Sequence, residues 1–137
     1  MSSIGDILVV EHDNLICALL TETLCEKGYT VRSARDRTGM HRALATQLPD
    51  LLICDVDLDR GPGLTLINDV RAACGAAVPL VLMTTSTWIA QSLARQGFTF
   101  CLLKPFHLND LLASVAMHIR THAPRDVAPF RTRAVGT

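Results

Sequence analysis

The sequence predicts an α/β protein in which a parallel sheet of five strands is covered by helices on both faces. Short apolar runs alternate five times with segments of helical periodicity, as expected of parallel strands joined by helices. The chain of 137 residues is long enough for one domain with its own core. Its apolar fraction of 49% is divided into short runs, and none approaches the ~18 residues that a membrane span needs.

The predicted strands are apolar runs bounded by turn residues. They are Ile7–Val10, Tyr29–Ala34, Asp50–Asp55, 78–85 (VPLVLMTT) and 98–103 (FTFCLL). The run DLLICD has the length and apolar content of a buried central strand. It ends on a carboxylate, Asp55.

A helix is expected after each strand, because apolar residues recur three and four positions apart. The first is capped by Asp13 or Asn14, ends at Gly28, and carries the stripe Leu15, Ile16, Leu19, Leu20, Thr23 and Leu24. The next three are Asp36–Gln47, Leu64–Ala73 and Trp88–Gln96. The last ends at Thr121 and carries the stripe Leu108, Leu111, Leu112, Val115, Ala116 and Ile119. Beyond this domain at 1–121, the loss of periodicity and two prolines predict a tail or truncated linker at 122–137.

Composition excludes several classes of function. Basic and acidic residues number 13 each, so no net field favours nucleic acid or a membrane surface. The 16 residues of the tail are too few for a helix-turn-helix. The N-terminus lacks a basic segment and a cleavage site, which argues against secretion. We therefore expect a cytoplasmic protein with no direct nucleic-acid or membrane partner.

The cysteines and histidines favour ordinary structural roles. The five cysteines have no C-x-x-C spacing, so neither a disulfide framework nor a zinc site is expected. We instead expect buried cysteines in a protein of a reducing compartment. His118 and His122 lie four residues apart and could share a metal, but a pair without a third ligand favours a solvated helix end.

Polar residues stand at the carboxyl ends of four predicted strands: Glu11, Asp55, Thr84 and Lys104. Singly, each has an ordinary explanation as a helix cap, a strand former or a turn residue. Together they should meet at one edge of the sheet, where ligands bind in folds of this class. The sequence therefore predicts a site with two carboxylates, a hydroxyl and an ammonium.

The segments ILVVEHD, DLLICDVDLDRGPGL, PLVLMTT and LLKPF resemble the successive signatures of response-regulator receiver domains of two-component signalling, over about residues 6–121. The resemblance implies a doubly wound, flavodoxin-like fold with strand order 2-1-3-4-5. It also implies the roles of single residues: Asp55 as phosphoacceptor, Glu11 as a metal-site acid, Thr84 as switch hydroxyl, Lys104 as phosphate-pairing lysine and Gly63 as the turn glycine before the third helix.

The same resemblance implies a bacterial phosphoprotein that is not an enzyme, apart from self-dephosphorylation. It would take a phosphoryl group from a sensor histidine kinase or a phosphotransfer protein and signal to a downstream protein target. Such a transfer joins two anionic groups, so Mg²⁺ held by oxygen ligands and an ammonium such as Lys104 would be needed to bring them together.

His12 stands where the family usually has the second metal-site acid. Its neutral form removes one negative charge, and a unit-charge pair at ~4 Å with an effective dielectric of ~20 is worth ~4 kcal/mol before desolvation. We therefore expect weakened Mg²⁺ binding, or replacement by an ion such as Mn²⁺, Zn²⁺ or Ni²⁺ that imidazole suits better. An alternative is a pH sensor, in which a protonated His12 occupies the place of the metal.

Two neighbouring acids could compensate for His12. Asp13 could turn inward, although capping the first helix competes with that role. Asp57 stands where the family supplies a backbone carbonyl, and its carboxylate could add charge to the metal site or orient the water that hydrolyses an acyl phosphate.

Other departures lie nearby. Cys101 replaces the usual aromatic switch residue, Thr85 a small alanine and Asp59 a common proline. Trp88, Phe98 and Phe100 are either core or a partner surface on the fourth helix and fifth strand, through which a homodimer could form.

Three functions compete. The first is a phosphoacceptor receiver, and the second is a degenerate receiver that acts as an interaction module without phosphorylation. The third is a phosphatase of the haloacid-dehalogenase type, suggested by the D-x-D of Asp55 and Asp57. That family places its motif on the first strand of a longer chain, which disfavours this third function. Asp55, Thr84 and Lys104 favour the first function over the second.

Overall fold

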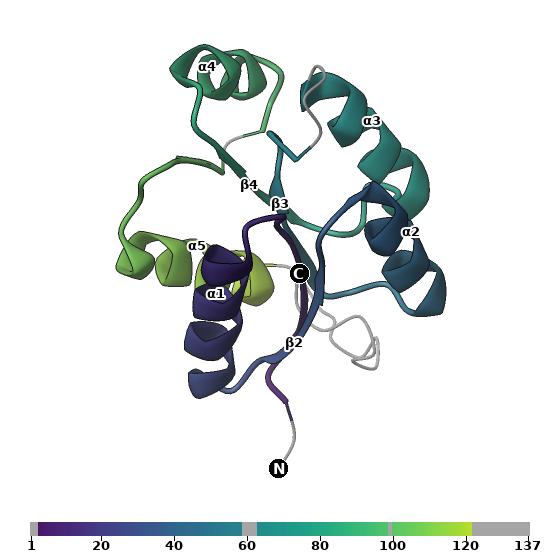
Figure 1. Ribbon diagram of the computed structural model, residues 1–137, viewed down its shortest axis with the longest axis vertical. Coiled ribbons are helices and arrows are strands. Elements are labelled where there is room, and N and C mark those ends of the chain that lie inside the picture. Colours follow the sequence, from purple (N-terminus) through teal and green to yellow (C-terminus); the bar gives the residue numbers. More distant parts are fainter. Residues whose placement is uncertain (1–2, 59–62, 99, 122–137) are drawn as a thin grey trace.

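The computed structural model describes residues 3–58, 63–98 and 100–121, and the predicted tail and Asp59 lie outside them. Within these residues, strands and helices alternate along the chain (Figure 1). The strands are β1 (Asp6–Val10), β2 (Thr30–Ala34), β3 (Leu51–Asp55), β4 (Leu80–Thr84) and β5 (Cys101–Leu103). The helices are α1 (Asn14–Glu26), α2 (Arg37–Thr46), α3 (Gly63–Cys74), α4 (Thr87–Arg95) and α5 (Leu108–Thr121).

The sheet has the order β2-β1-β3-β4-β5, and every pair of neighbouring strands is parallel. This confirms the predicted doubly wound α/β fold. The chain runs outward from β1 to β2 and then returns across β1 to β3. The order reverses between β1 and β3, so their carboxyl ends frame the crevice in which folds of this class bind ligands.

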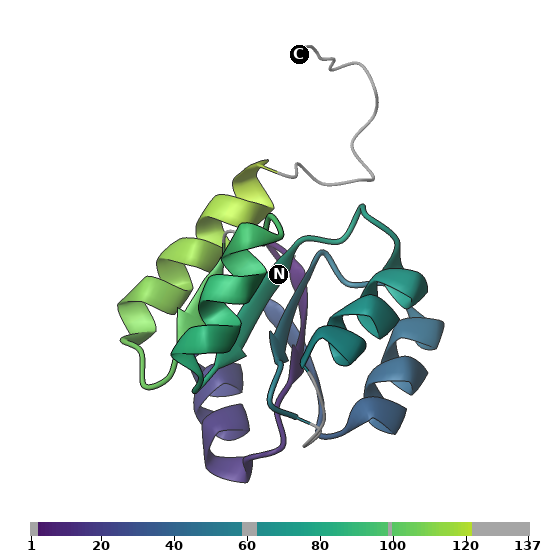
Figure 2. The same ribbon diagram turned by 90° about the horizontal axis from the view of Figure 1, so that it is seen from above.

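Both faces of the sheet are covered, which explains why its strands read as continuous apolar runs. In β1, Ile7 and Val9 belong to the core cluster that contains residues of α1 and α5. Leu8 and Val10 belong to the opposite cluster, which contains residues of α2 and α3. Figure 2 shows α2 and α3 on one side of the sheet and α1 and α5 on the other. Burial on both faces makes the strand ends a rigid platform for the site.

Three helices begin at side-chain caps, and for α1 the cap is one of the two residues predicted from the sequence. Asp13 caps α1 by accepting from the amides of Leu15 and Ile16 at 2.9 and 3.0 Å. Asp36 caps α2, and Ser86 caps α4 by accepting from the amide of Ile89 at 3.1 Å. Because Ser86 is the cap, α4 begins at Thr87, one residue earlier than predicted.

The apolar stripe of α1 is only partly buried. Its buried residues are Cys17, Leu20 and Leu24, whereas Leu15 and Leu19 are 82% and 47% exposed. Leu15 and Leu19 are four positions apart, so they lie on one face of the helix. This face forms an apolar strip beside the buried one.

The histidine and cysteine expectations need correction. His118 is buried rather than solvated: its Nδ1 lies 2.7 Å from the carbonyl oxygen of Ser114, and its ring lies edge to face with that of Phe100, with 3.8 Å between the ring centroids. This aromatic contact shields the ring from water. His122 lies outside the described residues. Cys25 is exposed, unlike the buried cysteines Cys17, Cys54 and Cys74.

The fifth strand is shorter than predicted, at Cys101–Leu103 instead of 98–103. Phe98 packs against the α2/α3 core cluster and Phe100 against His118. Trp88 is 68% exposed, so it is the member of the aromatic trio that is free to meet a partner. Dimerisation through this face stays a prediction. In the described part of the chain, no helix is long and apolar enough to cross a membrane.

Candidate functional site

The predicted polar residues meet at the carboxyl edge of the sheet. Glu11 directly follows β1, and its amide donates to the carbonyl of Ala34 at 3.0 Å. Asp55 ends β3, Thr84 ends β4, and Lys104 follows β5. The side chains of Glu11, Asp55 and Thr84 are at most 1% exposed, so this is a buried polar cluster at the end of a hydrophobic core.

A single ammonium bridges the two buried carboxylates. Lys104 Nζ lies 2.7 Å from Glu11 Oε1 and 3.3 Å from Asp55 Oδ2. Burial lowers the pKa of Lys104, but hydrogen bonds and charge from Glu11 and Asp55 outweigh it, so the pKa is raised above its ordinary value. The lysine is therefore a fixed cation, and the three side chains together carry one net negative charge.

His12 lies at the mouth of this cluster and is 62% exposed. Its Nδ1 is 3.5 Å from Glu11 Oε2 and 3.5 Å from Asp55 Oδ2. Ligand atoms of Glu11, His12 and Asp55 all lie within 4.8 Å of one another, a group that could hold a metal ion. Ligands of a tetrahedral ion with bonds of about 2.0–2.1 Å are separated by roughly 3.3 Å, which is close to the two separations of 3.5 Å that His12 Nδ1 makes.

This donor set fits a divalent cation, with a mixed preference. Glu11 and Asp55 offer the carboxylate oxygens that Mg²⁺ takes. The imidazole of His12 instead suits Mn²⁺, Zn²⁺ or Ni²⁺. Asp13 does not supply the missing acid, because its Oδ1 caps α1, which lowers its pKa mainly through the hydrogen bond from the amide of Ile16.

Asp57 departs from its expected place. Its carboxylate does not join the metal-ligand group of Glu11, His12 and Asp55. Instead, Oδ1 accepts from the Thr84 hydroxyl at 2.8 Å, and Oδ2 accepts from the amide and hydroxyl of Thr85 at 2.7 and 3.0 Å. The physical reason is that three well-placed donors, at the end of β4 and in the loop after it, satisfy both oxygens.

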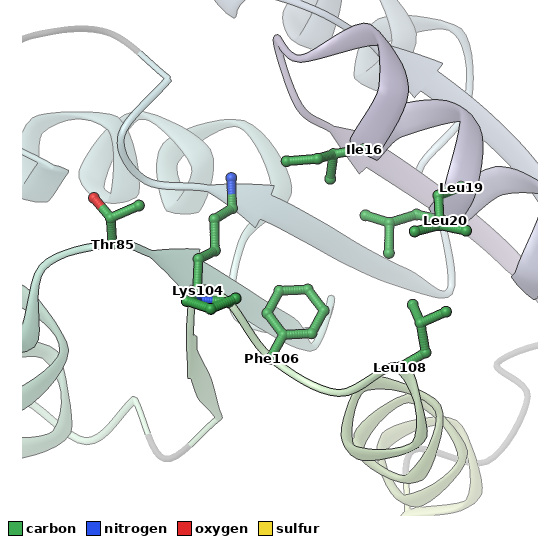
Figure 3. Close-up of a pocket in the computed structure, with 8 residues that line it drawn as sticks. Ile16, Leu19, Leu20, Thr85, Lys104, Phe106 and Leu108 are labelled. Carbon is green, nitrogen blue, oxygen red and sulfur yellow. The ribbon is translucent and has the colours of Figure 1, made fainter.

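An apolar pocket of about 420 Å³ adjoins the site. Figure 3 shows Ile16, Leu19 and Leu20 from α1 on one side and Phe106 and Leu108 on the other, with Lys104 and Thr85 at one end. The pattern of the sequence did not predict this pocket. The signal that could have found it is Leu19, which lines the pocket and widens the apolar stripe of α1 beyond what one buried face needs.

The fold and site together define a class of protein: a doubly wound domain with a buried carboxylate and a buried lysine at its strand-order switch. The family model described as "Response regulator receiver domain" matches residues 7–116, and the chain belongs to that family. The fold and family expected from the sequence are therefore confirmed.

Individual relatives agree with this assignment. "Response regulator MprA" of Mycobacterium tuberculosis strain H37Rv is 32% identical over 124 residues, which cover 89% of this chain and 54% of the relative. The chain thus spans about half the length of the curated relatives it matches. A two-component response regulator from Clostridium difficile superposes with a TM-score of 0.76 at 26% identity, covering 87% of this chain and 98% of the other. The chemotaxis response regulator CheY4 of Vibrio cholerae superposes with a TM-score of 0.72 at 25% identity, with coverages of 84% and 98%.

Proposed function

We propose that this domain accepts a phosphoryl group on Asp55 from a histidine of a sensor kinase or phosphotransfer protein, and passes the signal on through protein contacts. The observation that carries the proposal is the position of Asp55. Its carboxylate is 1% exposed yet stands at the switch point of the sheet, with the Lys104 ammonium 3.3 Å away. A buried carboxylate with a fixed cation beside it is suited to bind and hold an anionic group.

Each residue has a definite part in this reaction. A carboxylate oxygen of Asp55 attacks phosphorus, the bond from phosphorus to the donor imidazole breaks, and the acyl phosphate forms while that imidazole regains a proton. Lys104 pairs with the phosphoryl oxygens, and the Thr84 hydroxyl donates to one of them. Asp57 N donates to Asp55 Oδ1 at 2.9 Å, which leaves Oδ2 as the oxygen toward Lys104 and His12.

Glu11 and Asp55 would hold a divalent cation, with His12 as a third donor. When bound, the cation would offset the charge of the carboxylate and of the incoming phosphoryl group. The residues of this chain already supply part of that effect, because Lys104 neutralises one of the two buried acids. The identity of the ion, Mg²⁺ or a transition metal, is the part of the proposal that depends on His12.

The donor protein is proposed to cover the apolar pocket beside Lys104. A histidine that reaches Asp55 must approach the edge of the sheet where α1 begins, and there Leu15 and Leu19 are exposed. An amphipathic helix of the partner could bury these leucines in the way that helices fill apolar grooves. Contact along this strip would align the donor with Asp55.

A second candidate is a receiver that acts through its surface without phosphorylation. His12 favours it, because the metal site has one carboxylate fewer than the family usually provides. Cytoplasmic location remains a prediction under either function, and self-dephosphorylation remains a prediction under the phosphoacceptor function alone.

Intact mass spectrometry after incubation with acetyl phosphate and Mg²⁺ tests the proposal. A mass increase of one phosphoryl group is expected for the unaltered chain and for Asp69→Asn, a control that removes a carboxylate on α3. Asp55→Asn should show none. If the unaltered chain gains no phosphoryl group with Mg²⁺, Mn²⁺ or Zn²⁺, the phosphoacceptor function is wrong and the second candidate stands.

A further inference from the structure

Both oxygens of the Asp57 carboxylate are engaged by the end of β4 and by the loop that joins β4 to α4. The three hydrogen bonds come from the Thr84 hydroxyl at 2.8 Å, the Thr85 amide at 2.7 Å and the Thr85 hydroxyl at 3.0 Å. Each has a charged acceptor, and such bonds are shorter and stronger than neutral ones. Asp57 therefore fixes the position of this loop in the unmodified protein.

The Thr84 hydroxyl has one proton and cannot serve two acceptors at once. In the structure this proton points to Asp57 Oδ1, while the hydroxyl oxygen accepts from the amide of Ser86 at 3.1 Å. The proposed function requires the same proton for a phosphoryl oxygen on Asp55. The two arrangements exclude each other.

We propose that Asp57 is a positioning residue that acts as a latch: it holds the Thr84 hydroxyl and the loop in the unmodified state, and modification of Asp55 releases them. This inference rests on the proposed phosphoacceptor function. A phosphoryl group on Asp55 brings a charge of about −1.5 to −2 and new acceptor oxygens. It attracts the Thr84 proton and repels the Asp57 carboxylate, whose own amide is bonded to Asp55 Oδ1.

The release has a path to the surface. Thr84 Oγ1 accepts from the amide of Ser86, and Ser86 Oγ caps α4 by accepting from the amide of Ile89. Trp88 lies in this first turn of α4 and is 68% exposed. A shift of Thr84 therefore moves the start of α4 and the environment of the single tryptophan of the chain.

The latch sets how readily the modified state forms. Breaking the Asp57 contacts must accompany modification, so removing them beforehand should favour it. A hydrogen bond to a charged group contributes about 1.5–3 kcal/mol, which corresponds to roughly tenfold or more in an equilibrium constant. Asp57→Ala removes every acceptor. Asp57→Asn keeps one oxygen and loses the other, so its effect should be intermediate.

The test uses beryllofluoride, which mimics a phosphoryl group on a carboxylate, and follows Trp88 fluorescence at a fixed Mg²⁺ concentration. Asp57→Ala should bind beryllofluoride about tenfold more tightly than the unaltered chain, and Asp57→Asn a few-fold more tightly. Thr84→Val should bind more weakly. In the Thr84→Val background, Asp57→Ala should change the affinity clearly less than it does alone, because part of its effect passes through the Thr84 hydroxyl.

The free protein provides an independent measurement. Hydrogen exchange of the Thr85 amide, which donates to Asp57 Oδ2, should become at least several-fold faster in Asp57→Ala without any ligand. If beryllofluoride binds the unaltered chain and Asp57→Ala binds it equally or more weakly, the latch is wrong while the phosphoacceptor function survives. If neither the unaltered chain nor any variant forms an adduct at Asp55, both the latch and the phosphoacceptor function are wrong.

Discussion

Lys104 Nζ lies 2.7 Å from Glu11 Oε1, although 93 residues separate the two in sequence and Glu11 is fully buried. This ion pair joins the end of β1 to the loop after β5, across the full width of the site. A buried charge of this kind depends on its partner, because removing one member leaves the other uncompensated. The same pair also makes the lysine a competitor of any cation that approaches Glu11.

Replacing Lys104 with methionine should therefore lower stability and raise metal affinity together. We expect the free energy of unfolding to fall by about 3 kcal/mol in metal-free buffer, and the affinity for a divalent cation to rise about tenfold. Urea denaturation with and without Mg²⁺ measures both effects. The exposed Lys27 gives the control, since Lys27→Met should stay within about 0.5 kcal/mol. A Lys104→Met variant as stable as the unaltered chain would show that the ion pair contributes nothing.

Substituting His12 with aspartate should shift the metal preference toward Mg²⁺. The imidazole Nδ1 that it removes lies 3.5 Å from Glu11 Oε2 and from Asp55 Oδ2. The new carboxylate would add a negative charge on this side of the site, and even a strongly discounted charge interaction corresponds to about tenfold in affinity. Calorimetric titration should find Mg²⁺ bound at least tenfold more tightly, and the ratio of Co²⁺ to Mg²⁺ affinity lowered, because Co²⁺ loses a nitrogen ligand. His12→Asn serves as the uncharged control. An unchanged ratio would exclude the imidazole as a ligand.

The fold and the positions of the site residues could be predicted because they depend on local pattern and topology. Glu11, Asp55, Thr84 and Lys104 all directly end or follow strands, so the parallel order alone brings them to one edge. The partners of Asp57 could not be predicted. They depend on the path of a loop 27 residues further along the chain, where the donors of Thr84 and Thr85 outweigh any role at the metal site. Sequence spacing has no information about such a path.

His118 shows the same limit in the core. Its helical position predicts a solvated end, but the ring of Phe100 at 3.8 Å covers it. The exposed strip on α1 is the opposite case, because the apolar pattern predicts burial but Leu15 and Leu19 stay exposed to solvent. Periodicity locates a helix well, but the width of its buried face depends on what packs against it.

The apolar strip gives a prediction about the partner. Leu15→Gln combined with Leu19→Gln should slow phosphoryl transfer from a histidine-phosphorylated donor at least tenfold, because the donor helix loses its apolar contact. Phosphorylation by acetyl phosphate should be unchanged, since the small donor needs no docking surface. Leu48→Gln, at a leucine that is 42% exposed just before β3 and thus at the opposite edge of the sheet, is the matched control. Equal slowing with both donors would place the effect in the site and not in docking.

The last prediction concerns Cys101, which stands where the family usually has an aromatic switch residue. Burial, with a smaller contribution from the charge of Asp57, raises the pKa of the Cys101 thiol to about 11. Since an ordinary thiol ionises near pH 9, the unfolded chain loses this proton first, and the stability contributed by the neutral thiol falls as the pH rises from about 9 to about 11.

Urea denaturation at pH 8 and at pH 10.5 measures this loss. Cys101→Ala should lose less stability between the two pH values than the unaltered chain does. Mass spectrometric mapping gives a second measure: at pH 8, iodoacetamide should modify Cys101 far more slowly than the exposed Cys25. Asp57→Asn should lower the pKa of Cys101 and speed its modification, which ties this thiol to the loop that Asp57 holds. Equal modification rates for Cys101 and Cys25 at pH 8 would mean that Cys101 is neither buried nor near the Asp57 charge.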